Sequence, residues 1–499
     1  MSTSDHIEKI MKGAAIVILS MFLGKLFSYL YIIIVATKLG SQDYGVLSLG
    51  LAIISFANAF SLLGLDEGIL RFVSYYKGKN DFLSLKGTIL TSIKTVLNTS
   101  LFLSLLIIIF SDYISSIFNE YALIQVLFFL SLTLPFNTVA QIFLTSFRSF
   151  QKPEYEVLIK ELFEKSLRLI ITVILIILGF KLVGAIIGYI IAIILMCLMS
   201  VYLFNTKIIN IFKNEIKPIE NKKELLSYSL PLLLKNFMWF IIAWTDLLMI
   251  GYFKTISDVG IYNVALPTAN LIIMPAHGMM YLFLPIITGL YAKNNNDEIK
   301  ELYKKVSKYT LIINIPIFLI IFLLSKDLIS IFFGNEYNNA AYPLLILSVG
   351  YLFYSLSDIS INMLSVIKKT KTIFLIITLF ALSNIILNYF LIPSFGLIGA
   401  AIGTSISFII GSITMMIVSY YHNNLHPFMF KYKRIFLILL IILAIIMPLN
   451  SYFEFKPTVR IMIIIPAILV IYLILLNLFN VFEKEEFDLV NKIKNKFNI

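Results

Sequence analysis

Charge is scarce in this chain. Only 14% of its 499 residues are Asp, Glu, Lys or Arg, whereas 59% are hydrophobic and the mean hydropathy is +0.93. A soluble domain covers its core with charged side chains, so this composition excludes a globular fold in water. Cysteine is almost absent too: Cys197 is alone and cannot form an internal disulfide.

Signatures of catalysis are also missing. The sequence contains no Gly-Lys-Ser or Gly-Lys-Thr run, so it lacks the P-loop that binds ATP phosphates. Its four histidines, at positions 6, 277, 422 and 426, show no ligand-like grouping within one helix. A glycan polymerase or glycosyltransferase needs acid and base residues on a large outer loop. The longest outer loop that we predict, residues 325–340, offers only Asp327 and Glu336 as carboxylates. We therefore expect neither an enzyme nor a cofactor.

Long apolar runs recur from one end of the chain to the other. A helix needs about 20 apolar residues to cross the hydrocarbon of a bilayer. By this criterion we predict an all-α polytopic membrane protein of about fourteen transmembrane helices. The predicted spans are 13–37, 44–65, 87–110, 121–145, 156–178, 182–204, 228–252, 260–286, 307–324, 341–365, 372–393, 397–420, 434–450 and 458–480.

Basic residues alternate with these spans as the positive-inside rule requires. With both termini in the cytoplasm, the inner segments carry 28 Lys and Arg residues and the outer loops carry 5. A miscounted helix would reverse every later loop, yet the alternation holds to the end. The net charge of +12 then faces anionic lipid on the inner leaflet, so nucleic acid is not an expected partner.

The chain also repeats itself at an offset of 215 residues. Residues 43–46 match 258–261, and residues 180–188 match 395–403. We predict two six-helix lobes, 1–212 and 228–424, joined by a cytoplasmic linker at 213–227, with two additional helices and a tail in 425–499. Since six is even, the lobes are parallel repeats, which is an architecture of transporters with the site between repeats.

Five short motifs carry a family resemblance. They are Thr37–Gly45, Ser229–Pro231, Thr245–Tyr252, Phe333–Tyr337 and Leu391–Ala401. Their order along the chain resembles that in the polysaccharide transport flippases of the multidrug/oligosaccharidyl-lipid/polysaccharide exporter superfamily. The resemblance covers nearly the whole chain.

This resemblance implies a flippase in the plasma membrane that moves lipid-linked oligosaccharide, such as an O-antigen, capsule or teichuronic acid unit, by alternating access. It implies membrane lipids and glycan biosynthesis enzymes as partners, and we expect a monomer. A multidrug or small-molecule cation antiporter of the same fold is the alternative. Such antiporters usually have twelve helices, so the additional pair favours the polysaccharide branch.

Cations within the spans are candidates for binding the substrate. Lys25 is halfway along the first span, where a charge is costly unless it faces a cavity or a partner. It suits a diphosphate or an acidic sugar, and the alternative is an internal ion pair. Lys235 is nearer the inner surface and could snorkel to it instead. Arg71 follows Asp66 and Glu67, and this segment resembles one in the lipid II flippase. The alternative is that these three charges close a solvated helix end.

A second polar cluster is a candidate for coupling to a cation. Asp246, Asn384, Asn388 and Thr404 combine one carboxylate with amide and hydroxyl oxygens, which suits Na⁺ or a proton rather than a transition metal. The last three also resemble the sodium site of the lipid II flippase, where the position of Asn388 is acidic. The alternative is that the Asn side chains only join helices by hydrogen bonds. At the offset of 215 residues, the equivalent positions in the first lobe are Tyr31, Leu169, Val173 and Tyr189. The polar cluster is therefore present in one lobe alone.

Two further sets of charges receive structural interpretations. Lys160, Glu161, Glu164, Lys165 and Arg168 alternate in sign with helical spacing, which predicts i,i+4 ion pairs on a cytoplasmic extension of the fifth span. Arg460, at the outer start of the last span, is expected to snorkel to the surface.

Overall fold

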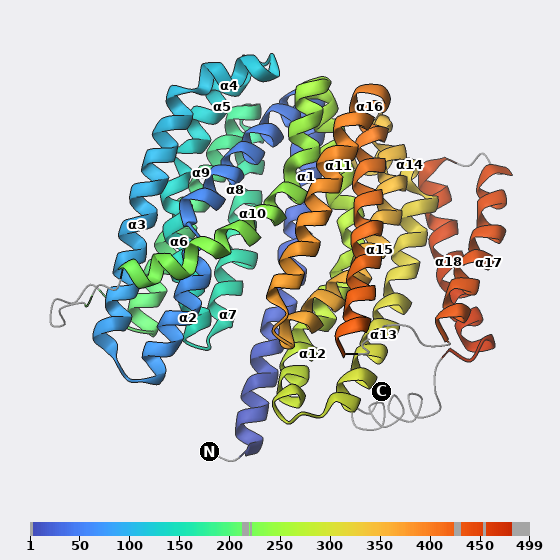
Figure 1. Ribbon diagram of the computed structural model, residues 1–499. Helices are drawn as coiled ribbons and strands as arrows, with labels where there is room; N and C mark the ends of the chain where they lie inside the picture. The colour runs from blue at the N-terminus through green and yellow to red at the C-terminus, as the bar shows by residue number, and fades with distance from the viewer. Residues whose placement is uncertain (1–2, 212–218, 220–221, 424–430, 453–455, 482–499) are drawn as a thin grey trace. The chain divides into compact units, whose positions relative to one another are not determined.

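The computed structural model describes residues 3–211, 219, 222–423, 431–452 and 456–481, and every regular element in these ranges is helical (Figure 1). This confirms the all-α fold. Most of the predicted linker at 213–227, and the tail after residue 481, lie outside the described residues.

The elements follow one another with short connections. The first part of the chain forms α1 (Thr3–Leu62), α2 (Leu65–Gly78), α3 (Phe82–Ile109), α4 (Ser111–Phe118), α5 (Ala122–Ser131), α6 (Thr133–Ser149), α7 (Pro153–Val157), the π-helix η1 (Leu158–Phe163), α8 (Glu164–Ile177) and α9 (Lys181–Lys207). The remainder forms α10 (Lys222–Phe253), α11 (Ile256–Asn270), η2 (Leu271–Ile273), α12 (Met274–Ala292), α13 (Asn296–Leu323), α14 (Ser325–Phe332), η3 (Asn335–Ala340), α15 (Ala341–Val366), α16 (Thr370–Asn423), α17 (Lys431–Tyr452) and α18 (Pro457–Leu478).

Eleven helical stretches in the described part of the chain are long and apolar enough to cross a membrane. The protein is therefore a multi-pass integral membrane protein. Each of α1 and α16 contains two predicted spans, separated at Gly40 and Gly396, where φ is 80° and 58°. Glycine adopts these angles without a Cβ clash, so the chain can change direction there with no intervening loop. The number of fourteen spans and the side of the termini stay predictions.

The predicted span 156–178 is not a single α-helix. It consists of α7, the π-helix η1 and α8. The backbone of α1 approaches η1 closely, because a Cβ added at Gly24 would lie 2.4 Å from the carbonyl oxygen of Glu161. A π-helical segment within an α-helix is rare and often marks a functional site.

The described residues form two compact units. We call those within 1–264 and 388–397 the first unit, and those within 265–387 and 398–499 the second unit. The lobe boundaries predicted from the repeat stay a prediction.

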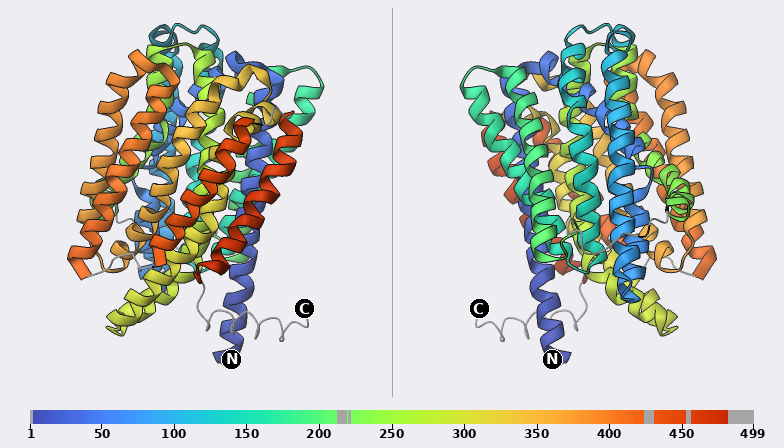
Figure 2. Two further views of the ribbon diagram at one scale, coloured as in Figure 1. Left: turned by 90° about the vertical axis from the view of Figure 1, so that its right-hand side faces the viewer. Right: turned by 90° about the vertical axis from the view of Figure 1, so that its left-hand side faces the viewer.

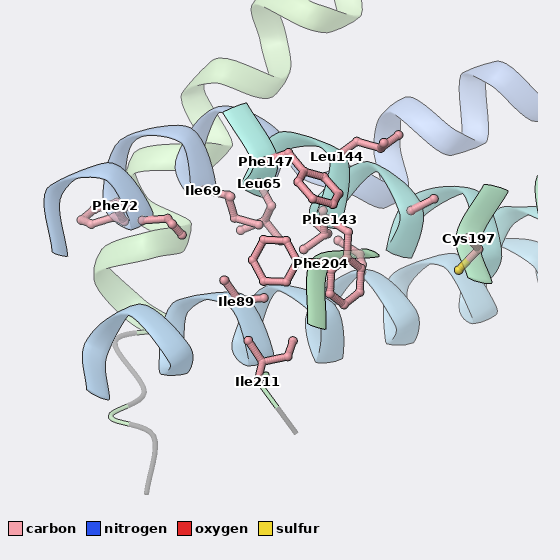
Figure 3. Packing of buried hydrophobic residues seen from close by; sticks show 14 of the residues in the cluster. Leu65, Ile69, Phe72, Ile89, Phe143, Leu144, Phe147, Cys197, Phe204 and Ile211 are labelled. Atoms are coloured by element: carbon pink, nitrogen blue, oxygen red, sulfur yellow. The ribbon is translucent and has the colours of Figure 1, made fainter. Parts of the chain in front are cut away.

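In the first unit, α6 packs against α2, α3 and α9 around an apolar core (Figure 3). The rings of Phe143 and Phe147 on α6 meet the ring of Phe204 on α9, with centroids 5.5 and 5.3 Å apart in edge-on contacts that aromatic pairs favour. Cys197 is buried in the same cluster.

In the second unit, α13 contacts α12, α15, α17 and α18. Helices α17 and α18 lie side by side (Figure 2). The hydroxyl of Tyr472 on α18 donates a hydrogen bond to the carbonyl of Ile312 on α13 at 2.9 Å. Pro316 follows four residues later and has no N–H, so Ile312 lacks its usual helical donor. Tyr472 supplies that donor from the additional helices.

Arg460 does not simply reach toward the surface as expected. Its Nη1 lies 3.4 and 3.5 Å from the two carboxylate oxygens of Asp327, which is 3% exposed. Since burying a carboxylate is costly without a partner, this contact joins α18 to α14.

The internal repeat is visible in the backbone itself. Helices α3 and α13 have the same length of 28 residues and start 214 residues apart, after the N-cap residues Asp81 and Asn295. Positive φ angles recur at the same offset or one close to it. They occur in the pairs Asn80 and Asn294, Asn119 and Gly334, Gln151 and Lys368, and Lys181 and Gly396.

Candidate functional site

Asp246 is a buried carboxylate in the middle of a membrane-embedded polar network. It lies on α10 and is 2% exposed. Tyr262 on α11 donates to its Oδ2 at 2.8 Å, and the amide of Asn388 donates to its Oδ1 at 2.7 Å. Both donors are neutral, so they stabilise the negative charge without cancelling it.

The neighbouring residue on α11 continues this network to α1. The amide of Asn263 donates to the hydroxyls of Tyr44 at 3.1 Å and Ser48 at 2.7 Å. These contacts are possible because the two helices touch at Gly45 and Gly260. Helix α11 therefore connects Asp246 to the point where α1 and α11 cross.

The other two residues of the predicted cluster form a pair in the second unit. The amide of Asn384 donates to the hydroxyl of Thr404 at 2.8 Å, and both side chains are at most 2% exposed. The structure thus arranges the four predicted residues as two hydrogen-bonded pairs, one in each unit: Asp246 with Asn388, and Asn384 with Thr404.

The pair in the first unit presents a buried carboxylate held by neutral donors, and its use as a cation or proton site stays a prediction. A carboxylate accompanied by amide and phenol oxygens is the type of ligand set that Na⁺ accepts. Protonation would also remove the cost of holding a charge within the bilayer. Tyr262 was not anticipated from the sequence, since a tyrosine in an apolar run gives no signal of its own.

The equivalents of Asp246 and Thr404 in the first repeat surround an arginine side chain. Arg168 on α8 lies over the ring of Tyr31 at 4.8 Å and over that of Tyr189 at 5.8 Å. Its Nε is 3.6 Å from Glu164, whose side chain is 7% exposed. Tyr31 and Tyr189 are the equivalents of Asp246 and Thr404 at the offset of 215. A guanidinium of the protein itself therefore occupies this region of the first repeat.

The predicted i,i+4 ion pairs are present, but they are not a solvated extension. Glu161 pairs with Lys165, and Glu164 pairs with Arg168. Arg168 is 18% exposed because the rings of Tyr31 and Tyr189 cover it. The alternating signs revealed the pairs, whereas their burial depends on contacts with α1 and α9 that the local sequence does not contain.

Lys25 lies beside this charged segment on an exposed face of α1. The neighbouring Gly24 packs against η1, and the charged groups acting on the Lys25 ammonium include Lys165 and Glu161. Lys25 therefore has features of both interpretations from the sequence: an acidic neighbour, as in an internal ion pair, and an exposed side chain, as in a substrate-binding site.

The other two predicted cations have different outcomes. The guanidinium of Arg71 stacks over the ring of Tyr228 on α10 at 4.2 Å, and its side chain is exposed. This cation–π contact holds Arg71 at the junction of α2 and α10. The backbone of Lys235 belongs to α10, but its side chain lies outside the described part of the structure.

Residues 34–342 match the protein family described as "Polysaccharide biosynthesis protein". The chain belongs to this family.

Curated relatives extend the similarity over the whole length. An uncharacterized membrane protein of Methanocaldococcus jannaschii is 25% identical over 97% of this chain and 99% of its own. A probable low-salt glycan biosynthesis flippase of Haloferax volcanii is 26% identical over 43% of this chain and 45% of its own. A putative O-antigen transporter of Shigella flexneri is 24% identical over 76% of this chain and 90% of its own.

Solved structures share the fold. The lipid II flippase MurJ in an inward closed conformation superposes with a TM-score of 0.74 and 19% identity, covering 92% of this chain and 98% of that protein. An inward-facing multidrug resistance transporter of the MATE family superposes with a TM-score of 0.68 and 18% identity, covering 82% and 98%.

Proposed function

We propose that this protein is a flippase that moves lipid-linked oligosaccharide from the inner to the outer leaflet of the cell membrane by alternating access. The observation that carries the proposal is the family match over residues 34–342, together with partial matches to relatives named as a probable glycan biosynthesis flippase and a putative O-antigen transporter. Enzymes of glycan biosynthesis would supply the substrate. The protein would act as a monomer and would not itself be an enzyme.

Lys25 is the residue that we propose to contact the substrate. A lipid-linked sugar carries phosphate next to its lipid, and an exposed ammonium on a membrane-embedded helix attracts that charge strongly in a low dielectric. Glu161 is the acidic group near this ammonium, and it is itself paired with Lys165. Arg71 and Lys235 are the other two cations of the first unit that we propose to bind the substrate.

Asp246 is the group that we propose to couple transport to a cation gradient. Na⁺ or H⁺ would neutralise the carboxylate, with Tyr262 and Asn388 as its neutral partners. Such binding drives a conformational change only if the affinity differs between the inward and outward states, typically by about 1–3 kcal/mol. Asn384 and Thr404 would respond to the same cation in the second unit. No further cofactor is required.

The test is flipping of a fluorescent lipid-diphosphate oligosaccharide in proteoliposomes, with and without a Na⁺ or proton gradient. Lys25→Ala should abolish flipping, whereas Lys25→Arg should retain it. Lys94→Ala is the matched control, since Lys94 is another exposed lysine on a membrane-embedded helix of the first unit. Normal flipping by Lys25→Ala would contradict its role as a substrate contact.

The coupling is tested in the same vesicles. Asp246→Asn should slow flipping and remove its dependence on the gradient. Gradient-independent flipping by the unmodified protein would contradict coupling while leaving the flippase proposal intact.

A multidrug or small-molecule cation antiporter is the second candidate, and the MATE-like fold favours it. The two functions are separated by the substrate: an antiporter would carry a cationic dye against a proton or Na⁺ gradient in these vesicles and would leave the lipid-linked sugar in place.

A further inference from the structure

A stripe of polar side chains runs along one face of α13 in the second unit. Ser307, Thr310 and Asn314 are spaced by three and four residues, so they share one face of the helix. Tyr303 begins the same face one turn earlier. All four side chains are 0% exposed, although the helix lies in a membrane-embedded stretch.

Most of these polar atoms have no hydrogen-bond partner among the described residues. This holds for the hydroxyl of Thr310 and for both the oxygen and the nitrogen of the Asn314 amide, whereas the Ser307 hydroxyl contacts that of Tyr432 on α17. Inside a bilayer no bulk water can compensate such groups, so each carries a large free-energy cost unless something binds it.

A matching stripe lies on α16. Ser405, Ser412 and Ser419 recur every seven residues and therefore share one face. The hydroxyl of Ser412 is buried and also lacks a partner among the described residues.

Contacts place the Tyr303 end of the first stripe beside the Ser419 end of the second, and both stripes touch α15. Tyr303 hydrogen-bonds Ser360 of α15 at 2.6 Å, and the Ser419 hydroxyl lies near that of Tyr303. At the other end, Ser405 donates to the carbonyl of Ile346 on α15 at 2.8 Å. Residues 346 and 360 are 14 apart on α15, as 405 and 419 are on α16. The polar face of α16 therefore follows α15 over this length.

The donors and acceptors on the two stripes indicate which molecule would bind between them. Polar groups that face one another beyond hydrogen-bond distance are commonly bridged by water. Asn314 offers both a donor and an acceptor, and the stripes contain hydroxyls that can do either, which suits water. A cation would need acceptors alone, and the stripes contain no carboxylate. Lys308, 1% exposed on the same helix, also disfavours a cation.

We propose that the stripes hold a file of ordered water molecules that hydrates the interior of the second unit. The file starts at Tyr303, two turns from the polar N-terminus of α13. It ends at Ser405, next to Thr404, which accepts a hydrogen bond from Asn384. Water there gives small hydrophilic species a route to the Asn384–Thr404 pair. Its use by a coupling ion rests on the proposed function, whereas the hydration does not.

Cysteine accessibility tests the file, because Cys197 is the sole cysteine and its replacement, Cys197→Ser, leaves a cysteine-free background. Thr310→Cys and Leu319→Cys are matched variants: both positions are 0% exposed, but Leu319 lies on the opposite face of α13 from Thr310. The probe is 2-aminoethyl methanethiosulfonate, which reacts with a thiolate formed in water. We expect reaction at position 310 about tenfold faster than at 319. Equal rates at the two positions would overturn the proposal.

The continuity of the file has its own measurement. A thiol introduced by Ser405→Cys should react several-fold more slowly when Thr310→Val and Ser412→Ala are added, because these changes keep the volume and remove two hydroxyls. An unchanged rate would mean that position 405 is hydrated by another route and that no file exists.

Radiolytic footprinting of the unmodified protein covers the case in which a variant fails to fold. Ordered water beside a buried ring produces hydroxyl radicals on exposure to X-rays. Tyr303 should therefore be oxidised, whereas Tyr337, equally buried at 0% exposure, should not. Protection of both rings would contradict the file. These measurements need neither substrate nor gradient, so their failure is distinguishable from failure of transport.

Discussion

Gly45 and Gly260 contact each other, and the close approach on one side of the contact is repeated on the other. A Cβ at Gly45 would lie 2.0 Å from the carbonyl oxygen of Ile256, and a Cβ at Gly260 would lie 2.1 Å from that of Ser41. Both pairs of equivalent residues, 45 with 260 and 41 with 256, are separated by 215 positions. The local contact between α1 and α11 is therefore close to two-fold symmetric, and only glycine permits it.

The first prediction concerns this contact. Gly260→Ala should lower the melting temperature, because the added methyl clashes with a backbone carbonyl that cannot rotate away, at a cost of about 1–3 kcal/mol. Gly278→Ala is the matched control: no atom lies within 4 Å of its added methyl, and alanine favours a helix. Thermal unfolding in detergent measures both, and an equal effect of the two changes would argue against the close contact.

The second prediction concerns the Asp246 network. Asn388→Asp places a second carboxylate beside Asp246, so Na⁺ should raise the melting temperature of this variant more than that of the unmodified protein. Tyr262→Phe removes one neutral donor and should weaken the response to Na⁺. Thermal shift against NaCl, with choline chloride as the ionic-strength control, measures both. A response identical in all three proteins would show that Na⁺ does not bind there.

The third prediction concerns Arg168. Arg168→Met leaves Glu164 as an uncompensated buried charge and should destabilise the fold by about 3–5 kcal/mol. Adding Glu164→Leu removes that charge and should recover most of the loss.

The matched control for this prediction is Arg148→Met. Arg148 pairs with Glu156 at 3.0 Å, but its side chain is 45% exposed, so the cost should be about 0–1 kcal/mol. Chemical unfolding of the three variants gives the values. Equal costs at the two arginines would contradict the buried role of Arg168.

The fourth prediction concerns the additional helices. Tyr472→Phe leaves the carbonyl of Ile312 without a donor and should cost about 1–3 kcal/mol. In a Pro316→Ala background the restored N–H of residue 316 can satisfy that carbonyl, so the same change should cost much less. A double-mutant cycle on unfolding free energy isolates the coupling, and additive effects would contradict it.

The fifth prediction concerns pH. Burial raises the pKa of the Asp327 carboxyl above its usual value, and Arg460 opposes that shift. A raised pKa means that the folded state binds the proton more readily than the unfolded state, so this group adds stability as the pH falls through its folded pKa and adds none at neutral pH. The unmodified protein should therefore gain stability relative to Asp327→Asn on mild acidification. A constant difference between the two proteins would contradict the shift.

Much of the architecture could be predicted from the sequence because a bilayer imposes simple rules. Apolar length located the helices, and the offset of 215 located the repeat that the backbone angles at Asn119 and Gly334 also follow. The hydrogen bonds of Asn388 with Asp246 and of Asn384 with Thr404 join residues that the spacing and the resemblance had grouped.

The remainder depends on which helix faces which, and a single sequence does not encode that locally. The charges around Arg168 predict a solvated extension, because nothing near it in the sequence indicates that Tyr31 and Tyr189 cover it. Tyr472 and Tyr262 were overlooked because a buried tyrosine resembles any other apolar residue. The π-helix at Leu158–Phe163 also has no signal in the local sequence, and the segment that packs against it, at Gly24, is distant along the chain.

Equivalent residues touch each other in isologous interfaces, where identical subunits meet about a two-fold axis. The contact between α1 and α11 has this geometry within a single chain, because Gly45 meets Gly260 and each Cβ would meet the carbonyl of the other's equivalent neighbour. One substitution therefore changes only half of the contact, and the same change at both glycines would act on it twice. The equivalence does not extend to the polar residues nearby: position 246 carries a carboxylate and its equivalent, position 31, an aromatic ring.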